Sequence, residues 1–168
     1  MSECLFCKIA HGKEDSVKIY EDELCLAFMD IYPLSRGHVL VIPKSHSEKL
    51  EDQYQAVQDH LFRVSNAIIG AQRAAKLGVG GTHFLINDGK QTNQHIPHVH
   101  LHLIPREPFD NFRFAYKIFM HFTGLFGFRT SNTKLETIAK QIRDHLPTEI
   151  IGNNYSLIPL HKNTKASI

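Results

Sequence analysis

The chain has 168 residues, of which 42% are hydrophobic and 21% charged, and its net charge is +2 with histidine neutral. This length fits one domain with its own core, and the charge is too small to indicate a nucleic acid partner. No apolar run is long enough to span a membrane, and the polar start at Met1 is unlike a signal peptide. We expect a cytoplasmic protein that binds neither nucleic acid nor membrane.

In chain order, the first 106 residues predict short strands around one long helix. Apolar runs bounded by turn residues indicate strands at 18–20, 24–30, 38–43, 82–87 and 96–104. Between the third and fourth runs, apolar residues recur at three- and four-residue steps, which is typical of an amphipathic helix. We expect this helix to begin with Ser47 as its N-cap and to end at Leu77, before Gly78.

After Pro105 the patterns weaken. Residues 112–128 are rich in aromatic residues and glycine, which favours core or dimer packing, with a lid over the site as the alternative. A second amphipathic helix is expected over 135–146. Together the elements predict an α+β fold, an antiparallel meander sheet with the long helix on one face and a C-terminal helix. Residues 1–147 would form the domain, and 148–168 a polar, poorly ordered tail.

Three histidines alternate with apolar residues in the last predicted strand. Because successive side chains of a strand point to opposite faces, His98, His100 and His102 share one face. A neutral imidazole attacks phosphorus well, and neighbouring rings can stabilise the charge that develops, so no catalytic metal is required. The middle ring would attack, with its other nitrogen donating to an acceptor such as a backbone carbonyl. A metal site and an inert polar face are the alternatives.

This pattern, His-φ-His-φ-His-φ-φ with φ apolar, resembles the signature of the histidine triad (HIT) family of nucleotide hydrolases and transferases. The opening from Cys4 to Asp22 and the stretch from Ala27 to His46 are also similar to that family. The similarity runs over about residues 4–106 in the family's order and spacing. It implies a HIT-like fold, a nucleotide substrate and a homodimer formed through the long helix and the neighbouring strand.

The resemblance also implies a role for each matching position. His100 is the nucleophile that becomes a nucleotidyl-histidine, and Asp30 holds ribose hydroxyls. Three further histidines contact phosphates or orient the nucleophile, an apolar wall surrounds the base, and two amides approach phosphate and ribose. These residues are His98, His102 and His38; Phe6, Ile9, Phe28 and Ile31; and Asn87 and Gln94.

Several of these positions have simpler interpretations. Asn87 also suits the turn before Gly89, Gln94 a loop surface, and the apolar wall an ordinary core. His95 stands where many members of the family carry a small hydroxyl residue, so the leaving-group preference stays open. It would either add a phosphate contact or face solvent.

The pair Cys4-x-x-Cys7 is weak evidence for a metal by itself. By resemblance, some HIT members with this opening bind a structural zinc through both cysteines, the histidine matching His46 and the first triad histidine, here His98. A closed set of two cysteines and two histidines is typical of structural zinc. The alternative is two reduced cysteines near a disordered end. Cys25 is predicted to be a core residue.

The sequence thus predicts a hydrolase that attacks the α-phosphorus of a nucleotide conjugate through His100 and releases a nucleoside monophosphate. By resemblance the product is AMP, and the substrates are dinucleoside polyphosphates, nucleoside phosphoramidates or aminoacyl-adenylates. A nucleotide-binding scaffold with little turnover and a metal-dependent oxygenase or hydrolase remain alternatives. The other histidines are expected at the surface or satisfied in the core: His11, His60, His83, His121, His145 and His161.

Overall fold

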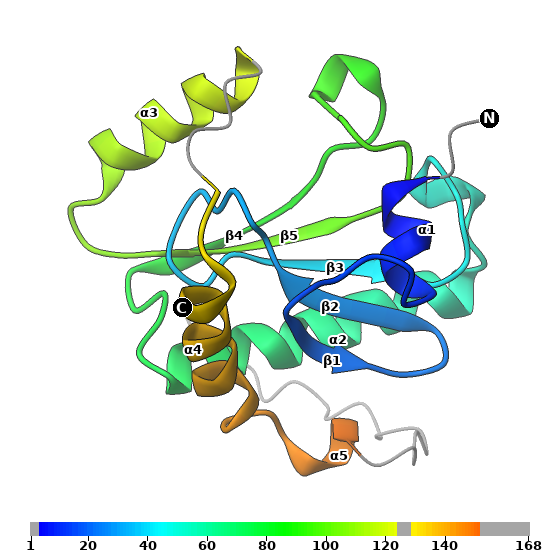
Figure 1. The fold of residues 1–168 in the computed structure, drawn as a ribbon, viewed down its shortest axis with the longest axis horizontal. Coiled ribbons are helices and arrows are strands. Elements are labelled where there is room, and N and C mark those ends of the chain that lie inside the picture. The colour runs from blue at the N-terminus through cyan, green and yellow to red at the C-terminus, as the bar shows by residue number, and fades with distance from the viewer. Residues whose placement is uncertain (1–3, 124–128, 152–168) are drawn as a thin grey trace, which may run out of the picture.

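The structure, a computed structural model, describes residues 4–123 and 129–151. These residues form a five-stranded sheet, with all neighbouring strands antiparallel, in the order β1-β2-β3-β5-β4 (Figure 1). The predicted α+β fold is confirmed. The strands are β1 (Lys18–Glu21), β2 (Cys25–Met29), β3 (Val39–Pro43), β4 (Gly81–Ile86) and β5 (Leu101–Arg106).

Helices cover both faces of the sheet. Figure 1 shows the short helix α1 on the near side of the sheet and the long helix α2 on the far side. The helix α4 packs beside α2 and against β1. The helices are α1 (Leu5–Ala10), α2 (Gln55–Ala74), α3 (Asn111–Phe122), α4 (Asn132–Arg143) and α5 (Thr148–Ile151), with 3₁₀ turns η1 (Leu50–Asp52) and η2 (Lys90–Thr92).

The strands β2 and β3 are buried along their whole length because each face of the sheet has its own apolar layer. One set of alternate residues packs with α2 and α4, and the other set packs with α1. The first set includes Cys25, Ala27, Met29, Val39, Val41, Leu101 and Leu103, and the second includes Leu26, Phe28, Leu40 and Ile42. Cys25 is therefore a core residue, as predicted.

The long helix begins later than the sequence prediction. It starts at Gln55, with Tyr54 at the N-cap position, and the prediction of Ser47 as the cap is wrong. Ser47 is instead buried, and its carbonyl accepts a hydrogen bond from the Val99 N–H at 2.9 Å. The helix also ends at Ala74 rather than Leu77, although Gly78 does adopt a left-handed conformation (φ 73°).

The strand that carries the triad is shorter at its start than predicted. It begins at Leu101 rather than at residue 96, so only His102 lies within β5. The pairing of β3 with β5 stops at Val41 opposite Leu101, because Pro43 has no N–H with which to extend the ladder. The segment before β5 forms a hydrogen bond outside the sheet, from the Val99 N–H to the Ser47 carbonyl. The predicted alternation nevertheless holds across it, since the apolar residues between the histidines join the core on the far face.

The aromatic stretch after the triad forms the helix α3. At its start, Arg106 forms a bidentate ion pair with Asp110 and stacks its guanidinium 3.7 Å from the Phe114 ring centroid. Phe114 is buried, whereas other aromatic residues of this helix are exposed, so the prediction of core packing holds for only part of the stretch. The exposed ones are Phe112, Tyr116 and Phe119.

At the C-terminal end of the described residues, Ile150 in α5 packs into the main core, and its carbonyl oxygen lies 3.1 Å from the Tyr20 hydroxyl. Residues 124–128 of the aromatic stretch and residues 152–168 of the predicted tail lie outside the described residues. Among the described helices, none has the length and apolar character needed to cross a bilayer.

A buried hydrogen bond between His60 and Asp22 joins α2 to the hairpin between β1 and β2. The carboxylate of Asp22 accepts hydrogen bonds from His60 Nε2 and the Tyr20 hydroxyl, both at 2.6 Å, through Oδ2. Its Oδ1 accepts the backbone N–H groups of Leu24 and Cys25, both at 2.8 Å. Burial raises the pKa of Asp22, but these hydrogen bonds outweigh it and hold the pKa below its usual value.

Replacing Asp22 with asparagine should therefore lower the free energy of unfolding by about 2 kcal/mol at neutral pH. The asparagine amide oxygen can still accept the N–H groups of Leu24 and Cys25. Its NH₂ group, however, then faces the His60 and Tyr20 groups that donate to Asp22 Oδ2 in the wild type. Because the pKa of Asp22 is lowered on folding, its contribution is present above the usual value of 3.8 and is lost as the pH falls below it.

Urea denaturation of both proteins across this pH range measures the effect. The difference between them should shrink as the solution becomes acidic. The matched control is Asp59→Asn, because Asp59 is exposed on α2, and it should cost less than about 0.5 kcal/mol. Equal costs for the two variants would contradict a stabilising role for the buried pair.

Candidate functional site

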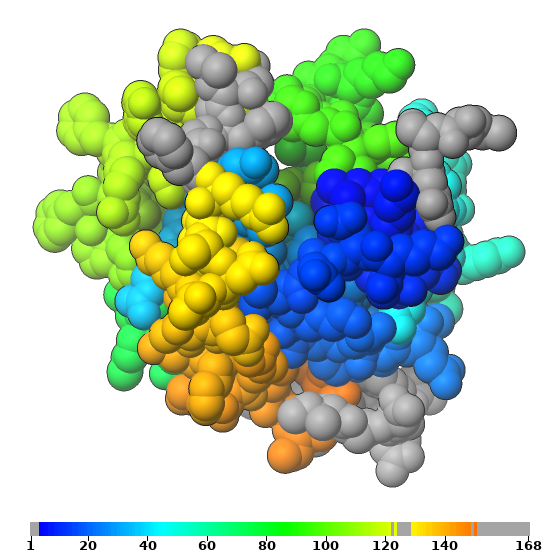
Figure 2. All heavy atoms as spheres, viewed as in Figure 1, coloured from blue at the N-terminus to red at the C-terminus, as the bar shows by residue number. Residues whose placement is uncertain are grey.

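A pocket of about 500 Å³ opens on the α1 face of the sheet, above β5. In Figure 2 the surface is hollowed between α1, in blue, and the segment that leads into α4, in yellow. The pocket lining contains most of the residues predicted for catalysis and nucleotide binding. They are His38, His100, His102, Phe6, Ile9, Phe28, Asp30, Ile31 and Asn87.

The backbone fixes the orientation of the His100 ring. Its Nδ1–H donates to the carbonyl oxygen of His98 at 2.7 Å, the kind of acceptor that the sequence analysis requires. This hydrogen bond assigns the proton of the neutral ring to Nδ1 and leaves the lone pair on Nε2. Burial lowers the pKa of His100, which favours the neutral form at neutral pH. The ring therefore has the tautomer that a nucleophile needs.

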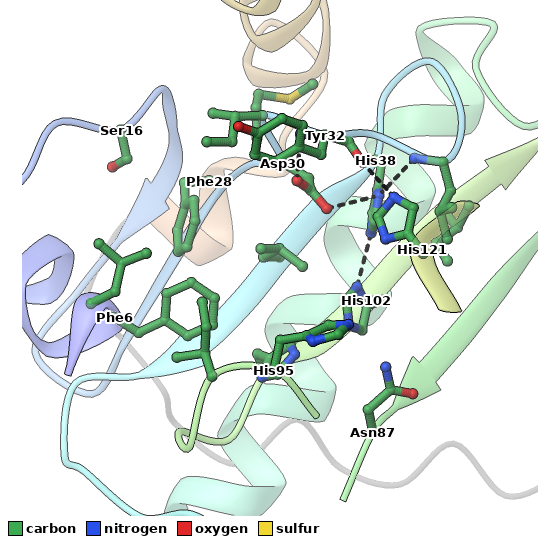
Figure 3. A pocket seen from close by; sticks show the side chains of 18 of the residues that line it. Phe6, Ser16, Phe28, Asp30, Tyr32, His38, Asn87, His95, His102 and His121 are labelled. Carbon is green, nitrogen blue, oxygen red and sulfur yellow. Dashed lines mark hydrogen bonds and ion pairs between the residues drawn. The ribbon is translucent and has the colours of Figure 1, made fainter. Parts of the chain in front are cut away.

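Behind His100, a chain of hydrogen bonds runs from the loop after β2 to His102 (Figure 3). The Leu34 N–H donates to His38 Nδ1 at 3.2 Å, and Asp30 Oδ2 lies 3.2 Å from the same nitrogen. Because the Leu34 N–H points at Nδ1, we assign the proton of His38 to Nε2, which then donates to His102 Nδ1 at 3.0 Å. His38 thus contacts His102 rather than the nucleophile.

This chain assigns the proton of His102 to Nε2, which is buried and has no hydrogen-bond partner among the described residues. Burial lowers the pKa of His38 to about 3 and that of His102 to about 2, so both rings are neutral at neutral pH. A buried donor without a partner is costly, and a ligand oxygen in the pocket would satisfy it. His102 can therefore donate a hydrogen bond to a bound phosphate.

An aromatic wall flanks the histidines on the α1 side. The rings of Phe6 and Phe28 meet edge to face with centroids 5.7 Å apart, and Phe6 lies 5.3 Å from the His100 ring in the same manner. Asp30 follows directly after β2, and its Oδ1 accepts the Tyr32 N–H at 2.8 Å. Burial is the main cause that raises the pKa of Asp30. A flat apolar group fits this wall, next to a carboxyl that can bind hydroxyls.

The ring of His98 points away from the pocket, into a cluster with Cys4, Cys7 and His46. Its Nδ1 lies 3.6 Å from Cys4 Sγ, 3.5 Å from Cys7 Sγ and 3.3 Å from His46 Nδ1. Its Nε2–H donates to the Pro43 carbonyl at 2.9 Å, which turns the lone pair of Nδ1 toward the cluster. Burial lowers the pKa of His98 to about 4, so this lone pair is available.

The two predicted amides differ in their placement. Asn87 lines the pocket, but the side chain of Gln94 does not, so the predicted contact of Gln94 with phosphate or ribose has no support in its position. Its Oε1 accepts the Gly89 N–H and its Nε2 donates to the Glu48 carbonyl, both at 2.8 Å. Gln94 therefore fixes the loop before the triad to the segment that precedes η1.

Sequence reasoning missed His121, which it assigned to the surface or to a satisfied core position. The structure places this ring in the pocket, where Nε2 donates to the Tyr32 carbonyl at 3.2 Å. No signal in the sequence could have found it, because the α3 stretch carries no motif and no spacing relates it to the triad. His95, which differs from the small hydroxyl residue found at this position in many members of the family, also lines the pocket.

Comparison with known proteins agrees with this geometry. The sequence profile of the HIT domain matches residues 11–109, a range that contains the whole triad. The chain belongs to the HIT family. A HIT-like protein of Borreliella burgdorferi is 40% identical over 115 residues, which cover 68% of this chain and 83% of that protein.

Some relatives of this HIT protein have named activities. The adenylylsulfatase HINT3 of Arabidopsis thaliana is 39% identical over 113 residues, which cover 65% of this chain and 55% of HINT3. The adenosine 5'-monophosphoramidase hnt1 of Schizosaccharomyces pombe is 37% identical over 103 residues, which cover 61% of this chain and 74% of hnt1. These names support nucleotide hydrolysis in general terms.

Solved HIT structures share the fold. A HIT-like protein from Bartonella henselae is 29% identical with a TM-score of 0.72, and the match covers 87% of this chain and 98% of that one. A zinc-bound histidine triad protein from Mycobacterium smegmatis is 33% identical with a TM-score of 0.67, covering 85% and 92%. The fold expected from the sequence resemblance is confirmed.

Proposed function

We propose that this HIT protein hydrolyses nucleotide conjugates by attack of His100 on the α-phosphorus, with a covalent nucleotidyl-histidine as the intermediate. The observation that carries the proposal is the hydrogen bond from His100 Nδ1 to the His98 carbonyl, at 2.7 Å. It leaves Nε2 of a pocket-lining ring as the nucleophilic atom. The names of the two relatives support AMP as the product.

The reaction has two displacements. In the first, His100 Nε2 forms a bond to phosphorus while the bond from phosphorus to the leaving group breaks. In the second, water attacks phosphorus, loses a proton to solvent and releases His100 with its lone pair restored. In both steps the Nε2–H of His102 donates to a phosphate oxygen and stabilises the charge that develops there. No step requires a catalytic metal.

The nucleoside would lie along the α1 side of the pocket. The edge-to-face pair of Phe6 and Phe28, with Ile9 and Ile31 beside it, offers an apolar surface for the base. Asp30 would hold the ribose hydroxyls, and Asn87 would approach the phosphate from β4. This arrangement puts the α-phosphorus over His100, between the base wall and His102.

Incubation with adenosine conjugates, followed by chromatographic measurement of AMP, tests the proposal. The panel contains adenosine 5′-phosphoramidate, diadenosine triphosphate, adenosine 5′-phosphosulfate and an aminoacyl-adenylate. We expect AMP release without added metal. Tight AMP binding with no release from any conjugate would favour a nucleotide-binding protein instead. Activity that follows added iron or manganese would favour a metal-dependent enzyme.

We also propose that Cys4, Cys7, His46 and His98 hold one structural zinc. Ligands on a tetrahedral zinc lie about 3.3–3.8 Å apart, given Zn–S and Zn–N bonds of about 2.3 and 2.0 Å. Four of the six separations among Cys4, Cys7, His46 and His98 are 3.3–3.6 Å and fit that geometry, and all the ligand atoms lie within 4.8 Å of one another. A closed site of this kind would tie α1 to the triad segment. Its reduced thiols support the predicted cytoplasmic location.

A homodimer through β4 remains our proposal for the assembly. Within the described residues β4 is an edge of the sheet, and an edge strand exposes unpaired backbone groups. Phe84 on β4 packs edge to face against Phe62 on α2 with centroids 5.2 Å apart, and both are partly exposed at 38% and 43%. A second copy at this edge would cover both rings.

Replacing Phe84 with glutamate should therefore convert the dimer to a monomer in sedimentation experiments, because two copies would bring like charges together. The matched control is Leu24→Glu, since Leu24 is exposed between β1 and β2, at the opposite end of the sheet order. It should leave the dimer intact. If Leu24→Glu and not Phe84→Glu dissociated the dimer, the β1 edge would be the contact.

A further inference from the structure

The loop between α1 and β1 brings polar side chains to one end of the pocket. Glu14, Asp15 and Ser16 are consecutive in the sequence, and all three line the pocket. Figure 3 shows Ser16 beyond Phe28, on the side of that ring away from the labelled histidines. The apolar surface proposed for the base therefore ends at a polar loop, which can contact the edge of a base.

Backbone hydrogen bonds fix both ends of this loop. At the end of α1, Gly12 adopts a left-handed conformation (φ 69°), and the Lys13 N–H donates to the Lys8 carbonyl at 2.8 Å. At the start of β1, the Val17 carbonyl accepts the Met29 N–H of β2 at 2.9 Å. Because the loop is held at both ends, a ligand that binds its side chains has little backbone left to order.

The hydroxyl of Ser16 is available for a ligand. Its Oγ is buried and has no hydrogen-bond partner among the described residues. A hydroxyl can donate as well as accept, and burying it without a partner costs free energy that a ligand atom can recover. Since Ser16 lines the pocket beside the surface proposed for the base, a polar atom of the base is the natural partner for its hydroxyl.

Glu14 and Asp15 add two carboxyl groups at the same place, and both residues are exposed. An ionised carboxylate only accepts hydrogen bonds, and its two oxygens can accept two adjacent N–H groups at once. A base edge with neighbouring N–H donors is therefore attracted to this loop. A base edge that presents a ring nitrogen lone pair is repelled by it.

The two common purines differ in this respect. Along one edge guanine presents the acceptor O6 and then two neighbouring donors, N1–H and the N2 amino group. Adenine presents one donor there, the N6 amino group, and then the lone pair of N1. The Ser16 hydroxyl can donate to guanine O6 while a carboxylate accepts both N–H groups, whereas adenine leaves this set of partners incompletely matched.

We propose, on the basis of the function proposed above, that Glu14, Asp15 and Ser16 select the base and that the enzyme prefers guanosine conjugates to adenosine conjugates. The aromatic wall binds either purine, and the loop discriminates between them. The chemistry at phosphorus is unchanged, so the preferred substrates release GMP. Adenosine conjugates remain substrates with a lower kcat/KM. This preference departs from the AMP product that the family resemblance implies.

The test compares kcat/KM for the 5′-phosphoramidates of guanosine, inosine and adenosine, which share one leaving group. The wild type should prefer the guanosine substrate to the adenosine substrate at least about tenfold, as expected for charge-assisted hydrogen bonds at an exposed site. Inosine lacks the N2 amino group and should lie between the two. Equal values for guanosine and adenosine, or a preference for adenosine, would overturn the proposal.

Two variants assign the preference to the loop. In the double variant Glu14→Gln/Asp15→Asn the ratio of the guanosine value to the adenosine value should fall close to one. In Ser16→Ala it should fall at least about threefold, as expected for the loss of one hydrogen bond. Both changes should appear in KM rather than in kcat, because these side chains would contact the base and not phosphorus.

The matched control is Glu23→Gln/Asp59→Asn, which also removes two exposed carboxylates, both outside the pocket. It should keep the wild-type ratio and the wild-type KM. An equal fall in this control would assign the preference to the net charge of the protein. That result would contradict base selection by the loop.

Binding of the two monophosphates separates this proposal from the hydrolase proposal. If the wild type releases monophosphates but the loop variants keep its ratio, base selection is wrong and the hydrolase proposal stands. If the wild type cleaves no conjugate, the hydrolase proposal fails, and calorimetric titration with GMP and AMP still tests the loop. Tighter binding of GMP that is lost in the double variant would support base selection, and equal affinities would refute it.

Discussion

Replacement of His100 with alanine should lower kcat/KM for AMP release by at least about 10³-fold, or about 4 kcal/mol. The variant loses the atom that would form the bond to phosphorus, and the neighbouring rings cannot replace it. His102 presents a protonated nitrogen to the pocket, and His98 points its lone pair into the cysteine cluster. Single-turnover assays on the preferred conjugate measure the effect on the chemical step.

The control for this variant separates catalysis from folding. His100→Ala should keep the metal content and the melting temperature close to those of the wild type, because its ring lies outside the cluster around His98. His145→Ala, a substitution outside the pocket, should keep full activity. A loss smaller than about tenfold in His100→Ala would rule out the assigned nucleophile, since a covalent step should cost more.

Replacement of Cys7 with serine should abolish zinc binding and lower the melting temperature by about 6–12 °C, which corresponds to about 3 kcal/mol for a chain of this size. Cys7 Sγ lies 3.3 Å from His46 Nδ1 and 3.5 Å from His98 Nδ1, so its loss opens the ligand set. Metal analysis of the purified protein should find one zinc per chain in the wild type and none in the variant.

The third cysteine supplies the control. Cys25 is fully buried in the far core, and burial raises the pKa of its thiol, so it stays protonated and is a poor metal ligand. Cys25→Ala should therefore keep its zinc. Wild-type protein that carries no zinc when purified without chelators would contradict the proposed site, as would a Cys7→Ser variant that retains it.

His98 couples the two sites. Its ring belongs to the cysteine cluster, while its backbone carbonyl accepts the proton of His100 Nδ1 at 2.7 Å. Loss of zinc would free the ring and with it the backbone that orients the nucleophile. We therefore expect Cys7→Ser to reduce AMP release as well as stability, although no cysteine lines the pocket.

The sequence predicted the face of the triad correctly because the period of two depends only on extended backbone. It also predicted the bounds of four strands to within one residue, but it misplaced the start of the triad strand and both ends of the long helix because these depend on partners far along the chain. The strand starts at Leu101 because Pro43 of a distant strand cannot donate, and Ser47 is no cap because the turn η1 separates it from the helix, which starts only at Gln55. No local pattern in the sequence predicts such long-range contacts.

The same distinction applies to the site. Residues that match family motifs, such as Asp30 and Asn87, do line the pocket, whereas the Gln94 side chain is used in a loop contact. His121 reaches the pocket only because α3 folds back onto the loop after β2, through Lys117 and its own bond to Tyr32. Tertiary packing brings the His121 ring to the pocket, and no periodicity in the sequence predicts this.

The most direct measurement stops the reaction within milliseconds of mixing with a cleavable adenosine conjugate and maps the protein by mass spectrometry. The proposed mechanism predicts one peptide, containing His100, that is heavier by a single adenylyl group, and no such adduct in His100→Ala. An adduct on another residue, or AMP release by the wild type with no adduct at any time, would contradict covalent attack by this imidazole.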